Sequence, residues 1–132
     1  MKVVVNVDGG ARGNPGPAAI GAVASEPGGG VLAERGERIG RATNNVAEYK
    51  AVLLGAALAR ELGASEVEVV GDSELIVRQI QGRYKVKDAG LKPLHAQARQ
   101  ALSEFENWSI RHVKRAHNAD ADRLVNATLD AA

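Results

Sequence analysis

The chain opens with a strand pattern that runs into a carboxylate. In the stretch VVVNVDGG, residues 3–10, a valine stands at every second position before Asp8 and two glycines. Because successive side chains of a strand point to opposite faces, Val3, Val5 and Val7 share one face, and their β-branched shape suits a buried strand. Aspartate is depleted in strands. Asp8 at the strand end therefore either opens a turn beside the glycines or has a task that needs its charge.

Turn and periodicity signals divide the rest of the chain. The sequence EPGGG, residues 26–30, is typical of a hairpin turn between two strands. Helical spacing of Val46, Tyr49 and Leu53 predicts a long helix that stops at Gly63. In chain order we expect strands at residues 3–8, 18–25, 31–40, 66–72 and 108–114, and helices at residues 46–62, 73–82, 91–104 and 118–129.

This order of elements predicts the fold class. Strands joined by a short hairpin are antiparallel neighbours, whereas strands joined through a helix need parallel partners. We therefore expect an α/β fold with one mixed five-stranded sheet, its first three strands antiparallel, flanked by helices. The length fits a single domain over residues 1–132, with no internal repeat or linker.

Composition excludes several kinds of site and location. The chain has no cysteine, which excludes disulfides and thiolate metal sites and favours a reducing cytoplasm. No apolar run approaches the roughly 20 residues that span a bilayer, and the N-terminus lacks a signal-peptide pattern. We therefore expect a cytoplasmic protein without membrane contact. No obligate protein partner is indicated, and a monomer is the default expectation.

Positive charge is unevenly distributed along the chain. The net charge of +1 is too small to indicate a nucleic-acid partner by itself. However, basic residues cluster at residues 78–92 and again at residues 111–117. Each cluster is either an ordinary solvated face or a contact surface for a polyanion.

Three further carboxylates stand where a strand ends or a helix begins. Each has a structural interpretation. Glu48 would complete a capping box whose N-cap is Asn45. Asp72 would cap the helix that starts at Ser73, and Asp122 would interact with the dipole of the last helix. Together with the carboxylate of the first strand, however, they would converge at one edge of the sheet, where α/β folds bind their ligands.

Clustered carboxylates of this kind need cations. They repel one another, and their pKa values would rise strongly without positive charge between them. Oxygen ligands favour Mg²⁺ or Mn²⁺ over zinc. Two such ions about 4 Å apart are a common device for phosphodiester hydrolysis. The carboxylates therefore indicate metal-dependent chemistry on phosphate.

Four segments carry these carboxylates in a characteristic order. They read DGGARGNPGPAAIG, TNNVAEYKA, VVGDSELIVRQIQG and HNADADRLVNATL, and they extend from the first strand to the last helix. In order and spacing they resemble the signature segments of the ribonuclease H type 1 family. One such segment alone would be weak evidence, whereas four in register, each with its carboxylate, are strong evidence.

The resemblance implies the fold of that family and an endonuclease that cuts the RNA strand of RNA/DNA hybrids, leaving 5′-phosphate and 3′-hydroxyl ends. It implies two ions, Mg²⁺ or Mn²⁺, one activating the attacking water and the other stabilising the leaving 3′ oxygen. The implied catalytic and metal-binding residues are Asp8, Glu48, Asp72 and Asp122. Asp8 would bridge both ions. In the last segment, Asn118 fixes the frame that selects Asp122, with Asp120 as the alternative.

The resemblance also implies contacts with the substrate. The implied substrate-binding residues are Gly9, Gly10, Asn14, Thr43, Asn44, Asn45 and Arg115. In the family, the glycine loop lies against the RNA strand, and the asparagines contact 2′-hydroxyls and base edges, which distinguishes RNA from DNA. Thr43 matches a contact to a phosphate of the DNA strand. His117 matches a catalytic histidine that helps a proton leave, and Arg115 is the alternative at that position.

One departure from the family concerns the first basic cluster. Many bacterial relatives carry a longer basic insertion there that grips the duplex. In this chain only RYKVKDAG, residues 83–90, lies between the two helices. We therefore expect weaker hybrid binding than in those relatives.

Two alternatives to a hybrid-cleaving enzyme remain. A noncatalytic module that binds hybrids or duplexes would keep the fold, but it would gain nothing from four carboxylates that face phosphate. Transposases, integrases and some exonucleases share the architecture with other carboxylate patterns, but they lack the segment TNNVAEY. The sequence leaves open whether double-stranded RNA is also cut and which ion is preferred.

Overall fold

The computed structural model describes residues 1–131, and its elements follow the predicted order. The strands are β1 (Lys2–Ala11), β2 (Gly16–Ser25), β3 (Val31–Ala42), β4 (Glu66–Gly71) and β5 (Asn107–His112). The helices are α1 (Asn44–Glu61), α2 (Glu74–Ile80), α3 (Lys92–Ser103) and α4 (Ala119–Asp130), and a 3₁₀ turn, η1 (Arg115–His117), precedes α4.

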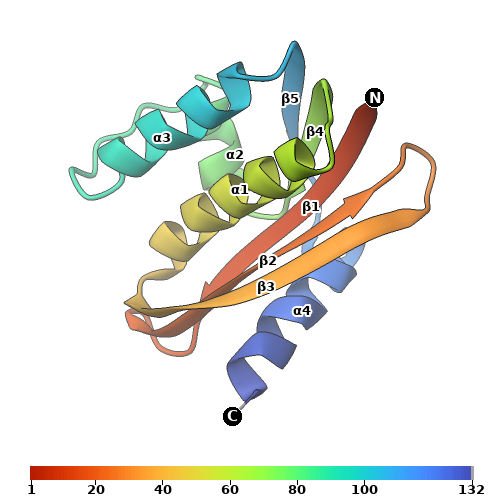
Figure 1. Ribbon diagram of the computed structural model, residues 1–132. Helices are drawn as coiled ribbons and strands as arrows, with labels where there is room; N and C mark the ends of the chain where they lie inside the picture. Colours follow the sequence, from red (N-terminus) through yellow and green to blue (C-terminus); the bar gives the residue numbers. More distant parts are fainter. Residues whose placement is uncertain (132) are drawn as a thin grey trace.

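Over residues 1–131 the strands form one mixed sheet of five strands in the order β3-β2-β1-β4-β5 (Figure 1). β2 pairs antiparallel with β1 and with β3, whereas β4 runs parallel to β1 and to β5. The predicted fold class is therefore confirmed. Because β1 and β4 are parallel neighbours, their carboxyl ends meet at the same edge of the sheet.

Helices cover both faces of the sheet. α1, α2 and α3 lie on one face and α4 lies on the other (Figure 1). Val3, Val5 and Val7 are at most 4% exposed, and Gly55 of α1 lies directly against Val5 and Val7. The valine face predicted from the sequence is therefore the part of the core that α1 covers.

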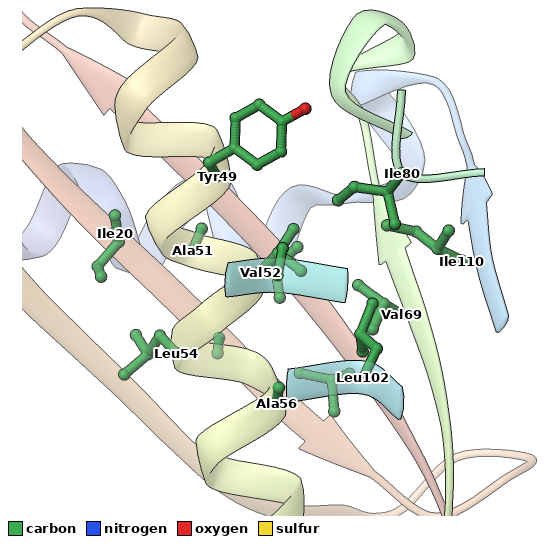
Figure 2. Close-up of a cluster of buried hydrophobic side chains, with 14 of the residues drawn as sticks. Ile20, Tyr49, Ala51, Val52, Leu54, Ala56, Val69, Ile80, Leu102 and Ile110 are labelled. Atoms are coloured by element: carbon green, nitrogen blue, oxygen red, sulfur yellow. The ribbon is translucent and has the colours of Figure 1, made fainter. Parts of the chain in front are cut away.

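The core continues from α1 across the parallel strands. Figure 2 shows Val52 of α1 among Val69 of β4, Leu102 of α3 and Ile110 of β5. Each of these side chains is at most 5% exposed. Burial of such aliphatic side chains is the main favourable contribution to folding.

β2 is buried along most of its length because α1 packs on one of its faces and α4 on the other. Its alanines and glycines allow both helices to come close. Gly21 lies against Ala121, Leu124 and Val125 of α4, the nearest atom being 3.2 Å from where a Cβ would stand. α4 is thus seated on the sheet by small residues and apolar contacts.

Most element ends differ from the predicted ones by one or two residues. The largest difference is in β1, which continues past Asp8 to Ala11 because residues 9–11 keep pairing with β2. The prediction that the strand ends at Asp8 is wrong, and so is the alternative that Asp8 opens a turn. Asp8 stands opposite Gly21 inside the antiparallel ladder with β2, one residue beyond the last pair of the parallel ladder with β4.

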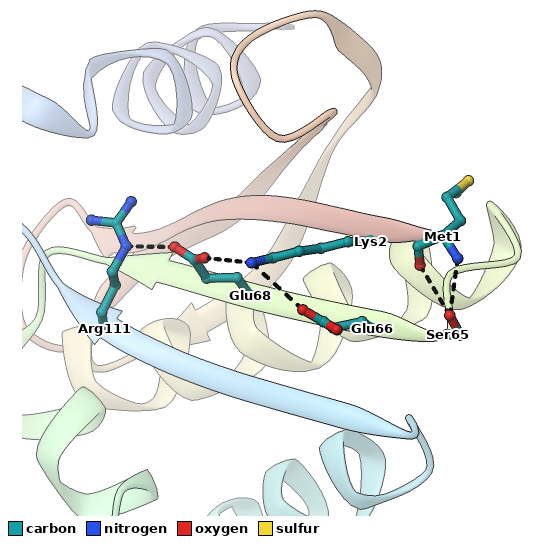
Figure 3. A network of polar contacts seen from close by, with 6 residues as sticks. All are labelled: Met1, Lys2, Ser65, Glu66, Glu68 and Arg111. Carbon is teal, nitrogen blue, oxygen red and sulfur yellow. Dashed lines mark hydrogen bonds and ion pairs between the residues drawn. The ribbon is translucent and has the colours of Figure 1, made fainter.

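Charged side chains link the strands near the beginning of β1 and β4 (Figure 3). Lys2 Nζ lies 3.5 Å from Glu66 and 3.4 Å from Glu68, and Arg111 Nε donates to Glu68 at 2.5 Å. The hydrogen bond from Arg111 lowers the pKa of Glu68 below its ordinary value. Arg111, which belongs to the second basic cluster, is therefore paired within the protein.

Among the helices of residues 1–131, none combines the length and the apolar character that crossing a bilayer requires.

Candidate active site

Two parallel strands bring the first two carboxylates together. Val7 of β1 stands beside Gly71 of β4 in the parallel ladder. Asp8 is the next residue of β1, and Asp72 directly follows the last residue of β4, so they lie side by side where β4 ends. Asp8 is only 8% exposed, because α1 and α4 flank its strand.

Glu48 reaches this edge from α1. Gly9 of β1 comes so close to α1 that a Cβ added there would lie 2.3 Å from the backbone of Ala47. Only glycine allows this approach. The backbone N–H of Gly9 donates to Glu48 Oε1, which fixes the carboxylate beside β1.

The capping roles considered for two of the carboxylates are wrong. α1 begins at Asn44, and its N-cap is Thr43, whose Oγ1 accepts from the N–H of Val46 at 3.2 Å. Asn45 is therefore inside the helix. In α2 the N-cap is Ser73, whose Oγ accepts from the N–H of the third residue beyond it at 3.4 Å. Asp72 caps no helix, and its side chain lines the hollow described below.

α4 supplies the fourth carboxylate from the other face of the sheet. Asp122 lies in the first turn of α4, as predicted, and its Oδ1 accepts from Arg115 Nη2 at 3.1 Å. Asp120 instead lies 3.6 Å from Arg123 on the helix surface. The structure thus brings Asp122, and not Asp120, to the other carboxylates.

A hollow of about 380 Å³ opens where these elements meet, and Asp8, Glu48, Asp72 and Asp122 all line it. Carboxylate oxygens of Asp8, Glu48 and Asp72 lie within 4.8 Å of one another. The convergence expected from the sequence is therefore present in the fold.

The electrostatics of the hollow favour cations. Burial, and then the charge of Asp72, raise the pKa of Asp8 to about 7. Burial and the nearby Asp8 raise the pKa of Glu48 to about 9. Negative charge is thus concentrated without full compensation. A divalent cation would supply the compensating positive charge, and a donor set made only of carboxylate oxygens fits Mg²⁺ or Mn²⁺.

The predicted substrate-binding residues surround these carboxylates. Gly9, Gly10, Asn44, Asn45 and Arg115 line the acidic hollow itself. The predicted residues that line an adjoining hollow of about 370 Å³ are Asn14, Thr43 and Asn45.

Two of the asparagines hold the loop after β1 against α1. Asn14 Oδ1 accepts from the N–H of Asn44 at 3.0 Å, and Asn44 Oδ1 accepts from the N–H of Ala11 at 2.9 Å. The loop and the start of α1 therefore form one continuous rim.

His117 lies outside the acidic hollow. It is exposed in η1 and lines a separate hollow of about 210 Å³ beside Asn6 and Ser25. Arg115, two residues earlier, lines the acidic hollow and contacts Asp122. The role of His117 stays a prediction, and Arg115 is the basic residue that reaches the carboxylates.

Several lining residues were not expected from the sequence, among them Ser73 and Asn126. Asn126 stands one turn after Asp122, and its Nδ2 donates to the carbonyl of Asp122 at 3.1 Å. Helical spacing from Asp122 was the signal that would have found it. For Ser73, the signal was its position directly after Asp72.

Comparisons with known proteins identify relatives of the chain. The family profile described as reverse transcriptase-like matches residues 6–128. The chain is 50% identical to the bifunctional protein Rv2228c of Mycobacterium tuberculosis, over 100% of this chain and 36% of that protein. The chain thus spans about a third of the length of the first curated relatives that it matches.

Two solved structures match the chain over all or nearly all of its length. RNase H1 from the halophilic archaeon Halobacterium salinarum NRC-1 is 45% identical, with a TM-score of 0.97 and all of both chains covered. LC11-RNase H1, solved in complex with an RNA/DNA hybrid, is 45% identical, with a TM-score of 0.92 over 97% of this chain and 96% of that one. From these similarities in sequence and structure, the chain belongs to the ribonuclease H type 1 family.

Proposed function

We propose that residues 1–132 form a single catalytic domain, an endonuclease that hydrolyses the RNA strand of RNA/DNA hybrids and leaves 5′-phosphate and 3′-hydroxyl ends. The observation that carries this proposal is the convergence of four carboxylates, from β1, α1, α4 and the end of β4, in one hollow. Family membership supports the reaction, and the hybrid bound to LC11-RNase H1 supports the substrate.

Asp8, Glu48, Asp72 and Asp122 would hold two divalent ions, Mg²⁺ or Mn²⁺. When bound, the ions supply positive charge that activates water for attack and offsets the charge on the leaving 3′ oxygen. Asp8 would be the ligand shared by both ions, because it lines the hollow together with Glu48, Asp72 and Asp122. Glu48, fixed by the N–H of Gly9, would keep its orientation during the reaction.

Selection of RNA over DNA would fall to the rim formed by the loop after β1 and the start of α1. Gly9 and Gly10 carry no side chain, so the RNA backbone would come close to β1. The amide groups of the rim asparagines would hydrogen-bond to 2′-hydroxyl groups, the feature that distinguishes RNA from DNA. Thr43 would contact a phosphate of the DNA strand.

Basic residues near the carboxylates would contact the substrate and move protons. Arg115 carries a permanent charge beside Asp122, which suits contact with a phosphate and orientation of that carboxylate. His117 would assist the departure of a proton only after η1 moves toward the hollow. The position of Arg115 favours it as the main basic residue of the site.

A second basic region would contact the other strand of the duplex. Between α2 and α3 a hollow of about 670 Å³ is lined by Arg83, Lys85, Lys92 and Arg99. The segment between these helices, residues 83–90, is short and allows few phosphate contacts. We therefore expect the affinity for hybrids to depend less steeply on salt than in relatives with a longer basic insertion. Equal slopes of hybrid affinity against salt concentration, measured under identical conditions, would contradict this expectation.

The test of the proposal is cleavage of a hybrid whose two strands carry different labels, in Mg²⁺, Mn²⁺ or EDTA, by the parent chain and by Asp8→Asn. We expect metal-dependent cutting of the RNA strand alone, abolished by EDTA and by the substitution. Binding of the hybrid without cutting in either metal would instead favour a noncatalytic binding module.

A further inference from the structure

We propose that Asn118, assisted by Asn6, is a positioning residue that sets the place of Asp122 relative to Asp8. The inference rests on the proposed function, since it assigns Asn118 a task in building the metal-binding hollow. Neither Asn118 nor Asn6 lines that hollow.

Asn118 connects the strand of one carboxylate to the helix of another. Its Nδ2 donates to the carbonyl of Val7 at 2.9 Å, and Val7 directly precedes Asp8. Its own backbone carbonyl accepts from the N–H of Asp122 at 3.1 Å. The backbones that carry Asp8 and Asp122 are thus joined through a single residue.

Asn6 holds the amide of Asn118 in the orientation that this link needs. Asn6 Nδ2 donates to Asn118 Oδ1 at 3.0 Å. Asn118 is 1% exposed, so both ends of its amide are satisfied inside the protein. A buried amide with directed partners admits one orientation, because any rotation would leave a polar group unpaired.

The side chain of Asn118 is used differently from what its place in the chain suggests. Asn118 stands at the N-cap of α4, where an asparagine side chain ordinarily accepts from an N–H of the first helical turn. Here no such cap hydrogen bond is formed, and the amide contacts β1 instead. The side chain of Asn118 therefore fixes the start of α4 to β1 instead of capping the helix.

Near Asp122, the other contacts between α4 and the sheet fix this position less strictly. The hydrogen bonds that Arg38 of β3 donates to α4 reach only the carbonyls of Thr128 and Leu129, at the other end of the helix. Ala121 and Val125 of α4 pack on Gly21 of β2 through small, apolar groups. Apolar contacts lack direction, so a small shift of the helix along the sheet would change them little. The hydrogen bonds of Asn118 would be broken by the same shift, and Asp122 would move away from Asp8.

Calorimetric titration of the metal-free protein with Mn²⁺ tests the inference without nucleic acid. The variants are Asn118→Ala, Asn6→Ala and, as a control for general destabilisation, Leu102→Ala, whose side chain is fully buried in α3. Melting temperature is measured for each, and titrations are made well below it.

We expect Asn118→Ala to weaken Mn²⁺ binding about 10-fold or more, as is typical when a partner behind a ligand is removed. Asn6→Ala keeps the bond to Val7 and should show a smaller loss. Leu102→Ala should lower the melting temperature and leave Mn²⁺ affinity unchanged.

Unchanged Mn²⁺ affinity in Asn118→Ala, or an equal loss in Leu102→Ala, would overturn the inference and leave the proposed function intact. If Asn118→Ala does not fold, Asn6→Ala decides, and unchanged affinity there overturns the inference. Absence of Mn²⁺ binding by the parent chain would remove the proposed function together with the inference.

Discussion

The two ends of the parallel pair β1 and β4 differ in whether their carboxylates are paired with cations. Near the beginning of the strands, Lys2 lies between Glu66 and Glu68, and Arg111 adds a second cation, so the pKa of Glu68 is lowered (Figure 3). Where β4 ends, the carboxylates of the acidic hollow lie close together, and the pKa values of Asp8 and Glu48 are raised. Among the ion pairs of residues 1–131, one arginine reaches that cluster, Arg115 at Asp122.

The difference separates side chains that serve the fold from those that serve chemistry. Compensated charges at the surface cost little and contribute little. Uncompensated carboxylates in a partly buried hollow lower stability, and a protein retains them only where a function requires them. The four experiments that follow alter one end of the strand pair or the other.

Asp8→Asn has the largest expected effect and acts in opposite directions on function and stability. We expect hybrid cleavage to fall by at least about 1000-fold, because the carboxylate shared by the cluster is removed. In EDTA the melting temperature should rise by several degrees, because a neutral amide relieves repulsion at a buried position. Labelled-hybrid kinetics and scanning calorimetry measure the two effects.

The matched change at the other end of the strands is Glu68→Gln. It should leave cleavage unchanged and lower the melting temperature slightly. A lower melting temperature for Asp8→Asn than for the parent chain would contradict the view that the acidic end opposes folding.

Gly9→Ala tests how tightly β1 and α1 must approach to place Glu48. The new Cβ would lie 2.3 Å from the backbone of Ala47. We expect the free energy of unfolding to fall by about 3 kcal/mol, because backbone must shift to admit it. Gly10→Ala is the control, since its Cβ would lie 3.8 Å from Val125 in ordinary contact. Equal urea midpoints for the two variants would refute the close-approach argument.

The raised pKa values predict how stability depends on pH without metal. Asp8 titrates at about 7 instead of 3.8, and Glu48 at about 9 instead of 4.5. Between these values the folded state holds protons that the unfolded chain has released. The free energy of unfolding contributed by these groups is therefore present at low pH and is lost as pH rises from about 4 through about 9.

Scanning calorimetry in EDTA across this range should show a declining melting temperature, which Mn²⁺ restores at the alkaline end. The combined variant Asp8→Asn, Glu48→Gln should give a flatter profile. Parallel profiles for the variant and the parent chain would show that other groups cause the decline.

Arg111→Ala has the smallest expected effect. It removes the hydrogen bond to Glu68 at the compensated end. We expect a loss of about 0.5 kcal/mol in the free energy of unfolding, typical of exposed pairs, and a smaller loss in high salt. Urea denaturation at low and high ionic strength measures it. A loss as large as that of Gly9→Ala would mean that this end is structurally as demanding as the other.

The sequence predicted the sheet and the acidic cluster because both depend on periodic or local signals. Alternating valines gave the buried face of β1, and the change to helical spacing located α1. The hairpin glycines set the antiparallel half of the sheet. The convergence of Asp8 and Asp72 followed from the rule that parallel strands end at one edge.

Other features could not be predicted because local signals do not distinguish them. Thr43 and Asn45 are both good N-caps, as are Asp72 and Ser73, and only the fold decides which one caps. The extension of β1 beyond Asp8 depends on pairing with β2, which glycines alone do not reveal. The burial of Asn118 depends on Val7, which is 111 positions away in the chain.

That separation has a consequence for the growing polypeptide. Strands β1 and β4, with helix α1, are all synthesised before residue 72, so three of the four carboxylates leave the ribosome early. The fourth arrives only with α4, the last helix in the order of elements. While α4 is still inside the exit tunnel, the nascent chain would carry an incomplete hollow. The four carboxylates would therefore act together only after α4 has left the tunnel, and not gradually as the earlier elements emerge.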